Sequence, residues 1–260
     1  MINLLQKLRD TEVEPGRVAV CSLGQAGFIY KRSNGDYVLI DPYVTDSCAT
    51  KLGRHFQRIM PSLIDPEELN DLPISAYLIT HHHEDHLDEE CVRRIVSTEF
   101  PFYTPPETIR QLVALGIAAD RCFALADGRS YLHAGMEIHG TFADHGELAP
   151  DAVGIVFQSD GKTIYHMGDT CLNEGEMKRI SEKFAIDLMI APINGKYGNM
   201  DEREAAQAVS LVNPGTAIPC HYWMLPGNSG GNPLAFLEEA ESMAPKTRTL
   251  MLTQGEIILI

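Results

Sequence analysis

A short segment of the chain holds four side chains that could bind a metal ion. His81, His83, Asp85 and His86 fall within six consecutive residues. Imidazole nitrogens and carboxylate oxygens are the side-chain ligands that zinc and related divalent cations take in proteins. The spacing therefore predicts a metal-binding loop, because a solvated polar turn would not account for so many ligand types placed so close together.

The residues on either side of this loop are typical of a strand and a helix. The apolar run 76–79 predicts the end of a buried strand. Asp88 is suited to cap a helix over 88–95. A strand end and a helix start would fix the loop from both sides, as a rigid array of metal ligands requires.

Three further polar side chains each follow a predicted strand. His145 lies in a turn, Asp169 follows Gly168, which allows a sharp bend, and His221 stands at a strand end. With the loop they make five imidazoles and two carboxylates. One tetrahedral zinc takes about four ligands, whereas seven suit a pair of metals about 3.5 to 4 Å apart with a bridging water.

Each of the three downstream residues also has a simpler interpretation. His145 could be a surface histidine, Asp169 a helix N-cap, and His221 a buried core histidine. His82 alternates with the loop ligands, so its ring is expected to point away from the metals. His166 either donates a hydrogen bond to a ligand or is an ordinary strand residue.

Substrate-binding residues are expected in two loops beside these strand ends. The Gly-rich segment 194–201 follows a buried strand, and Lys196 could pair with an anionic group while Tyr197 stacks or hydrogen-bonds. Trp223 follows His221 and could form an apolar wall. Ordinary loop chemistry is the alternative for all three residues.

The segment 44–64 shows no clear hydrophobic period. It carries a small basic cluster, and it is interpreted either as a solvated loop or as a flap that binds an anionic substrate. The cluster consists of Lys51, Arg54, His55 and Arg58.

Hydrophobic periodicity predicts the elements that must position these residues. Early strands, helices, late strands and further helices suggest two stacked sheets with helices outside. The predicted strands cover 17–23, 27–31, 37–40, 101–103, 122–125, 136–142, 154–158, 162–167, 187–191, 216–220 and 257–260, the first three as an antiparallel meander. The predicted helices cover 1–9, 106–115, 172–184, 203–212 and 233–242. We expect one domain over residues 1–260, because no linker or repeat interrupts the chain.

The composition excludes several classes of partner. The formal net charge of −15 argues against nucleic acid, whose binding rests on neutralisation of phosphates by Lys and Arg. No apolar run approaches the ~18 to 20 residues of a membrane helix. A small-molecule substrate, which a metal centre allows to be anionic, is expected, and a homo-oligomer is left open.

The six cysteines are scattered without CxxC spacing, which predicts reduced thiols. The first residues show no signal-peptide core, so a cytoplasmic location is expected.

The ordered features resemble the metallo-β-lactamase superfamily. The pattern is His81-x-His83-x-Asp85-His86, then His145, Gly168-Asp169-Thr170 and His221, and it covers the chain from about residue 17 onward. Leu23-Gly24-x-x-Gly27, Ile40-Asp41-Pro42 and Pro219-Cys220-His221 are similar to the branch that contains L-ascorbate-6-phosphate lactonase.

This resemblance implies an α/β (α+β) fold, the four-layer αββα sandwich, with the metals between the sheets at one edge. It also implies that Asp41 supports the histidine-rich loop. One metal would take His81, His83 and His145, the other Asp85, His86 and His221, with Asp169 bridging them. One or two divalent ions are expected, and neither Mn²⁺ nor Zn²⁺ is favoured.

The expected chemistry is hydrolysis by a water whose pKa the metals lower, oriented by Asp85 or Asp169 as catalytic residues. The first hypothesis is a lactonase acting on a small sugar-acid or sugar-phosphate lactone, because a lactone is an activated ester. The second is a phosphodiesterase or phospholipase D-like hydrolase of the same fold. The third is a metal-binding protein without activity, which would need a closed coordination shell.

Overall fold

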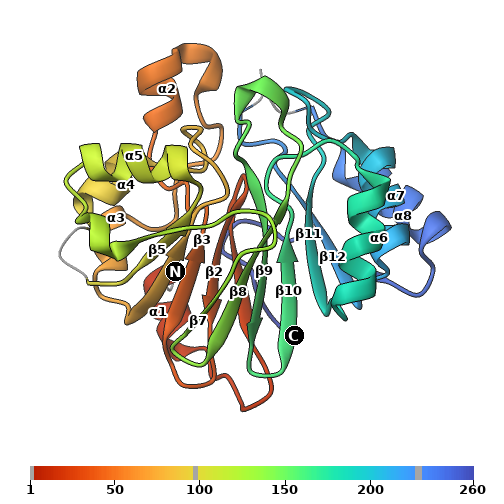
Figure 1. The fold of residues 1–260 in the computed structure, drawn as a ribbon, viewed down its shortest axis with the longest axis horizontal. Helices are drawn as coiled ribbons and strands as arrows, with labels where there is room; N and C mark the ends of the chain where they lie inside the picture. The colour runs from red at the N-terminus through yellow and green to blue at the C-terminus, as the bar shows by residue number, and fades with distance from the viewer. Residues whose placement is uncertain (1–2, 96–98, 226–229) are drawn as a thin grey trace.

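Two mixed β-sheets packed face to face, with helices on both outer faces, form the protein (Figure 1). The structure is a computed structural model and describes residues 3–95, 99–225 and 230–260. Seven strands are described in each sheet. This architecture is the four-layer αββα sandwich that the sequence predicted.

The first sheet has the strand order β14-β1-β2-β3-β4-β5-β6. Strands β1, β2 and β3 form an antiparallel meander, as predicted. The pairs β3–β4, β4–β5 and β5–β6 are parallel. The strands are β1 (Ala19–Gly24), β2 (Gly27–Lys31), β3 (Tyr37–Ile40), β4 (Ile74–Leu78), β5 (Phe102–Thr104), β6 (Cys122–Ala124) and β14 (Ile257–Leu259). The helices packed against it are α1 (Leu4–Asp10), α3 (Pro66–Leu69), α4 (Glu89–Arg94) and α5 (Pro106–Ala114).

The second sheet has the order β13-β12-β11-β10-β9-β8-β7. It is antiparallel from β7 to β10 and parallel from β10 to β13. The strands are β7 (Ser130–His133), β8 (Met136–Phe142), β9 (Val153–Ser159), β10 (Lys162–His166), β11 (Leu188–Pro192), β12 (Thr216–Cys220) and β13 (Arg248–Thr249). The outer helices are α6 (Glu174–Lys183), α7 (Glu202–Val212) and α8 (Pro233–Met243).

An apolar layer fills the space between the two sheets, and two further layers lie under the helices. Central strands such as β3 and β11 are buried along their whole length because both of their faces are covered. Burial on both sides explains why these strands appear in the sequence as continuous apolar runs. It also makes their ends rigid points of attachment for polar loops.

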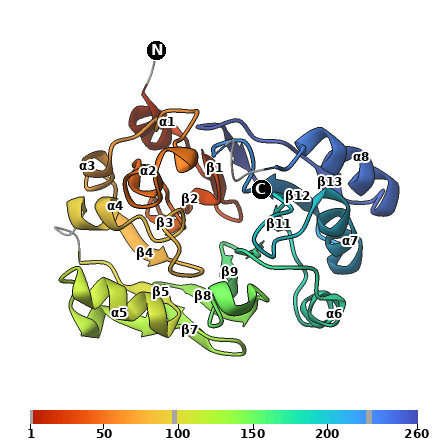
Figure 2. The same ribbon diagram turned by 90° about the horizontal axis from the view of Figure 1, so that it is seen from above.

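The polar loops meet at one edge because neighbouring strands end there together. In the first sheet Ile40 pairs with Leu78, so β3 and β4 end side by side. In the second, His166 pairs with Ile190, and Pro192 pairs with Cys220. Val153 N donates to Thr80 O at 3.0 Å and ties the two sheets together at this edge. Figure 2 shows these loops from above.

The predicted strands and the main predicted helices are present, with shifts of a few residues at their ends. The predicted helix over 1–9 appears as α1, and its first two residues lie outside the described part. The interpretation of 44–64 as a solvated loop was wrong, because this segment forms α2 (Ser47–Leu52) and the 3-10 helix η1 (Arg54–Phe56). The sequence analysis also missed α3, β7, β13 and two further 3-10 turns, η2 (Ala119–Arg121) and η3 (Gly146–Leu148), all elements too short to show a period.

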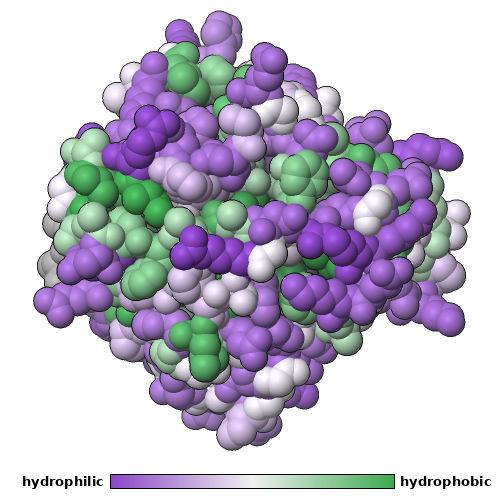
Figure 3. Space-filling view, viewed as in Figure 1, coloured by the Kyte–Doolittle hydropathy of each residue, from purple (hydrophilic) through white to green (hydrophobic). Residues whose placement is uncertain are grey.

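Hydrophilic side chains predominate on the face drawn in Figure 3, and hydrophobic ones gather mainly on the α5 side. Among the described residues, the helices are too short or too polar for any of them to cross a membrane.

Candidate metal centre

The seven predicted ligands lie together at the shared edge of the two sheets. They form three overlapping groups, in each of which the potential ligand atoms lie within 4.8 Å of one another. The groups are His81–His83–His145, His81–His86–Asp169 and Asp85–His86–His221. The first and third groups contain the same residues as the two ligand sets implied by the resemblance. The division between two ions stays a prediction.

Three imidazoles converge in the first group. His83 Nδ1 lies 3.0 Å from His81 Nε2 and 3.3 Å from His145 Nε2. His83 Nε2 lies 3.2 Å from the carbonyl oxygen of Leu148, and a carbonyl can only accept a hydrogen bond. The proton of His83 is therefore on Nε2, and the Nδ1 lone pair points at the other two rings.

Asp41 fixes two further rings, and the predicted support of the loop by this residue is confirmed. Its Oδ2 accepts from His86 Nδ1 at 2.7 Å and from Thr80 Oγ1 at 2.6 Å, while Oδ1 accepts from Thr80 N at 2.8 Å. Because the Thr80 hydroxyl proton is given to Asp41, its oxygen can accept from His81 Nδ1 at 3.1 Å. In both rings Nδ1 is thus held by this network, and Nε2 is the nitrogen directed at the centre.

The third group places a carboxylate beside two imidazoles. Asp85 Oδ2 lies 3.0 Å from His221 Nε2 and 3.8 Å from His86 Nε2. Asp169 stands between the groups, with Oδ1 3.3 Å from His86 Nε2 and Oδ2 3.3 Å from His221 Nε2. Its Oδ2 also lies 3.8 Å from His145 Nε2 in the first group. This is the place that a bridging ligand would take.

Burial and charge act in opposite directions on these pKa values. Burial holds the pKa of His81 well below its usual range and lowers that of His145 to about 4, so both rings are neutral at pH 7. Burial also lowers the pKa of His86, but the carboxylates of Asp169 and Asp85 raise it by more, so the net pKa is well above 6.5. A cation would replace the extra proton there, as metal binding to protonated ligands does.

The residues fit divalent metal ions. His86 Nε2 and Asp169 Oδ1 face the centre and are buried side-chain atoms without a hydrogen-bond partner in the described structure. Unpaired buried polar atoms are costly unless something else binds them. Imidazole nitrogens with free lone pairs, set among carboxylate oxygens, are a ligand set suited to Zn²⁺ or Mn²⁺.

His166 positions the turn that carries Asp169. Its Nε2 lies 2.8 Å from the Ala26 carbonyl oxygen, so this nitrogen donates, and Nδ1 accepts from Gly168 N at 3.2 Å. A Cβ added to Gly168 would lie 2.9 Å from the Thr80 side chain and from the Val153 carbonyl. Among the described contacts its ring bonds to backbone atoms, so the predicted hydrogen bond from His166 to a ligand side chain is not formed.

His82 lies outside the three ligand groups, as predicted. It faces a separate surface pocket, whose lining includes Arg110 and Asp151.

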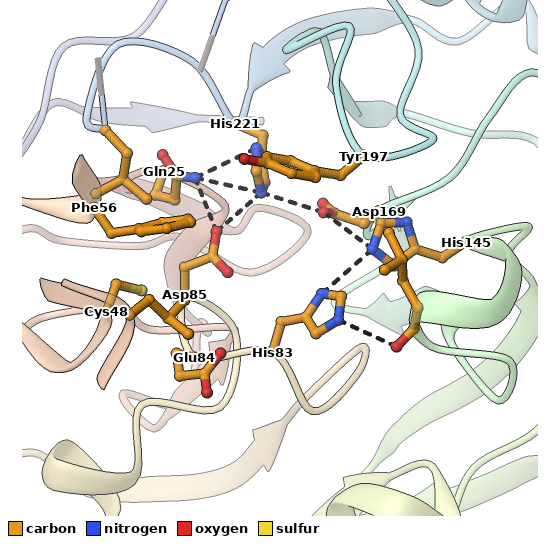
Figure 4. Close-up of a pocket in the computed structure, with 13 residues that line it drawn as sticks. Gln25, Cys48, Phe56, His83, Glu84, Asp85, His145, Asp169, Tyr197 and His221 are labelled. Atoms are coloured by element: carbon orange, nitrogen blue, oxygen red, sulfur yellow. Dashed lines mark hydrogen bonds and ion pairs between the residues drawn. The ribbon is translucent and has the colours of Figure 1, made fainter. Parts of the chain in front are cut away.

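A pocket of about 240 Å³ opens over the candidate centre. Figure 4 shows Cys48 and Phe56 on the Asp85 side and Tyr197 extending toward His221 and Asp169. Its lining combines polar groups with an apolar wall and consists of Gln25, Cys48, Leu52, Phe56, His83, Glu84, Asp85, His145, Leu148, Asp169, Tyr197, His221 and Leu225. Tyr197 is thus where the sequence analysis placed it, at the site.

Much of this wall was missed from the sequence. Cys48, Leu52 and Phe56 recur every fourth residue across α2 and η1, and this spacing could have revealed one face lining a pocket. Leu148 and Leu225 carry no comparable signal. Gln25 is in the tight turn after β1, and only its position at the same sheet edge pointed to the site.

Two predicted substrate residues do not line this pocket. Trp223 packs beside the Tyr222 ring with centroids 6.0 Å apart, and it lines another surface groove. Left-handed backbone at His221 (φ 60°) and Trp223 (φ 64°) turns the chain, so that Leu225 contributes to the wall instead. Lys196 is exposed outside the lining.

The basic cluster of 44–64 does not line the pocket either. Arg58 is buried, and its Nη1 donates to the carbonyls of Tyr43 at 2.7 Å and Thr45 at 3.3 Å. Lys51 pairs with Glu89 at 2.7 Å. The segment therefore lies at the site, as the flap hypothesis predicted. It presents apolar side chains to the pocket and not the basic ones that were expected to bind an anionic substrate.

Comparisons with known proteins agree with this geometry. The family described as "Beta-lactamase superfamily domain" matches residues 36–222, well over half of the chain. The chain belongs to this family. A UPF0173 metal-dependent hydrolase of Caldivirga maquilingensis is 30% identical over 245 residues, covering 91% of this chain and 95% of the relative. Another from Herpetosiphon aurantiacus is 28% identical over 244 residues, covering 90% and 94%.

Solved structures show the same fold. Igni18, a metallo hydrolase from Ignicoccus hospitalis, is 26% identical with a TM-score of 0.75 over 94% of this chain and 98% of that one. An isothiocyanate hydrolase from Delia radicum gut bacteria is 20% identical with a TM-score of 0.73 over 92% and 98%. Together with the ligand set, these findings make the chain a metal-dependent hydrolase of the metallo-β-lactamase fold.

Metal binding should stabilise this protein measurably. A ligand at 100 times its Kd adds about 2.7 kcal/mol to the unfolding free energy. For a chain of this size that corresponds to a rise in Tm of about 5 to 10 °C. We expect this rise when Zn²⁺ or Mn²⁺ is added to chelator-treated protein in a thermal melt. An unchanged Tm with both metals would contradict the assignment.

Proposed function

We propose that the protein hydrolyses a small, uncharged lactone that carries an apolar substituent. The observation that carries this proposal is the pocket lining, in which no lysine or arginine occurs among the described residues. Cys48, Leu52, Phe56, Leu148 and Leu225 would instead contact an apolar group next to the metal centre. Ligand pockets of this kind are mostly apolar with a few convergent polar groups.

The lactone part of the proposal follows the resemblance to the L-ascorbate-6-phosphate lactonase branch. The phosphate part of that resemblance has less support, because an anionic group would have to be bound by the metals alone. The phosphodiesterase or phospholipase D-like alternative has the same weakness. Glu84 at the pocket further disfavours an anionic substrate.

The residues of the site would have different roles in the proposed hydrolysis. Bound metals would lower the pKa of a water and polarise the substrate carbonyl. The carboxylates of Asp85 and Asp169 lie within 3.3 Å of His221 Nε2 and can accept hydrogen bonds that orient the attacking water. Tyr197 extends over the same centre, where its ring can cover the substrate. The apolar wall excludes water from the opposite side.

A panel of lactones tests this proposal. Each substrate methylene that is buried against the apolar wall should stabilise the transition state by about 0.8 kcal/mol, which corresponds to roughly a fourfold gain in kcat/KM. We expect kcat/KM of the metal-loaded protein to rise along a series of γ-alkyl lactones until the pocket is full. Phe56→Ala should flatten this rise, whereas Phe142→Ala, which alters an exposed residue outside the lining, should not. Faster hydrolysis of a carboxylated or phosphorylated lactone would overturn the proposal.

The same apolar pocket supports a second candidate, the electrophilic carbon of an uncharged isothiocyanate. The structural neighbour from Delia radicum gut bacteria is an isothiocyanate hydrolase, which suggests this substrate class, although that likeness shows only the fold. Alkyl isothiocyanates therefore belong in the panel, and their hydrolysis without that of any lactone would favour this candidate. As the organism's metal supply often decides between Mn²⁺ and Zn²⁺, both metals should be tried.

A further inference from the structure

Gln25 lies among the ligands of the Asp85–His86–His221 group without any role in the hydrolysis described above. Its side chain is buried, with 3% of the residue exposed, and it projects from the turn between β1 and β2. Its Nε2 is 2.9 Å from Asp85 Oδ2 and 3.3 Å from both ring nitrogens of His221. Figure 4 shows this amide directed at Asp85 and His221.

The separations between these atoms match those of ligands around one cation. Metal–ligand bonds of about 2.0 to 2.2 Å place neighbouring donor atoms roughly 3.0 to 3.5 Å apart. The amide end of Gln25, Asp85 Oδ2 and His221 Nε2 are separated by 2.9 Å, 3.0 Å and 3.3 Å. The amide therefore stands where a further ligand of the Asp85–His86–His221 group would stand.

The present orientation of the amide does not suit a cation. An NH₂ group would direct its positive end toward the metal, while Oε1 is buried and has no hydrogen-bond partner in the described structure. A half-turn of the terminal amide exchanges oxygen and nitrogen without other movement, and this torsion has a broad, roughly two-fold profile. It would place Oε1 where Nε2 now lies.

The backbone holds Gln25 at this position. Its φ of 51° is left-handed, and its carbonyl accepts from His221 N at 2.9 Å. The residue is thus tied to the strand end that carries His221. Strained backbone of this kind is retained where the surrounding structure requires it, often at functional sites.

We propose that Gln25 is an additional metal ligand, binding through Oε1 to the cation held by Asp85, His86 and His221. Carboxamide oxygens are suitable ligands for harder cations such as Mn²⁺. With Gln25, the Asp85–His86–His221 group would have two oxygen ligands, whereas the His81–His83–His145 group has only imidazole nitrogens. It concerns metal binding alone, and the hydrolysis of the wild-type metal-loaded protein tests the proposed function separately.

Metal affinity, measured by competition with a chromogenic chelator, distinguishes a ligand from a hydrogen-bond donor. Gln25→Leu removes both functions and should weaken the binding of one metal ion per chain at least about tenfold. Gln25→Glu keeps the oxygen but cannot donate to Asp85, so it should bind metal at least as tightly as the wild type. Gln158→Leu changes a glutamine at the other end of the second sheet and is the control. A Gln25→Leu variant within threefold of the wild type, or a Gln25→Glu variant as weak as Gln25→Leu, would overturn the proposal.

A crystal structure of the wild-type protein with metal bound gives an independent answer that does not depend on how the variants fold. We expect Gln25 Oε1 at roughly 2.0 to 2.5 Å from the cation held by Asp85, His86 and His221. An amide more than 3 Å from the metal, or one that still donates to Asp85, would show that Gln25 only positions a ligand.

Discussion

Asp169→Ala should lower kcat/KM for any substrate of the metal-loaded protein by about 10³-fold or more. The reason is the position of this carboxylate, whose two oxygens lie 3.3 Å from nitrogens of His86 and His221 and 3.8 Å from that of His145. Metal catalysis supplies several kcal/mol of transition-state stabilisation, and about 4 kcal/mol corresponds to 10³-fold in rate. The same variant should bind fewer metal ions per chain, as measured by elemental analysis.

Asp187→Ala is a suitable control for this loss. Asp187 is also a hydrogen-bonded carboxylate, accepting from Thr163 N at 2.8 Å, but at the opposite end of β10. It should therefore retain near wild-type activity and metal content. If Asp169→Ala kept both properties while folded, the carboxylate would be a simple turn residue and the dinuclear arrangement would be wrong.

The ligand positions could be predicted from the sequence because they depend on the spacing of residues that are close together in the chain. The spacing in His81-x-His83-x-Asp85-His86 and the strand ends before His145 and His221 are visible as residue types and apolar runs. Parallel strands that end together then bring these residues to one edge, which follows from the fold class alone. For the same reason the support given by Asp41 at the end of β3 agrees with the sequence analysis.

The pocket wall could not be predicted in the same way. Whether Trp223 or Leu225 faces the centre depends on left-handed backbone at His221 and Trp223, and neither residue type signals that conformation. Arg58 looked like a surface cation, yet it is buried because three carbonyl oxygens accept from its guanidinium. Such side-chain environments arise from tertiary packing, which a single sequence does not encode in any local pattern.

The support of the loop by Asp41 makes a second strong prediction. Asp41→Asn preserves the shape of the side chain and tolerates the left-handed backbone at this position (φ 46°). It replaces one acceptor oxygen by an NH₂ group that faces donors of Thr80 and His86. Leaving buried donors unpaired costs about 1 to 3 kcal/mol each, so we expect a loss of about 2 to 4 kcal/mol in unfolding free energy. Urea denaturation would show this as a lower midpoint with an unchanged slope.

Asp41→Asn should also weaken metal binding about 10- to 100-fold, as loss of a partner behind a metal ligand does. Asp41 holds the protons of His86 and, through Thr80, of His81 on Nδ1, which leaves both Nε2 atoms free to bind. Without this acceptor the rings can adopt the other tautomer, and its Nε2–H cannot bind a cation. Asp46→Asn, which changes an exposed aspartate without a capping hydrogen bond, is the matched control and should alter neither quantity. A variant that lost stability but kept its metal affinity would show that Asp41 supports only the loop backbone, and that the ring tautomers are set by the metals themselves.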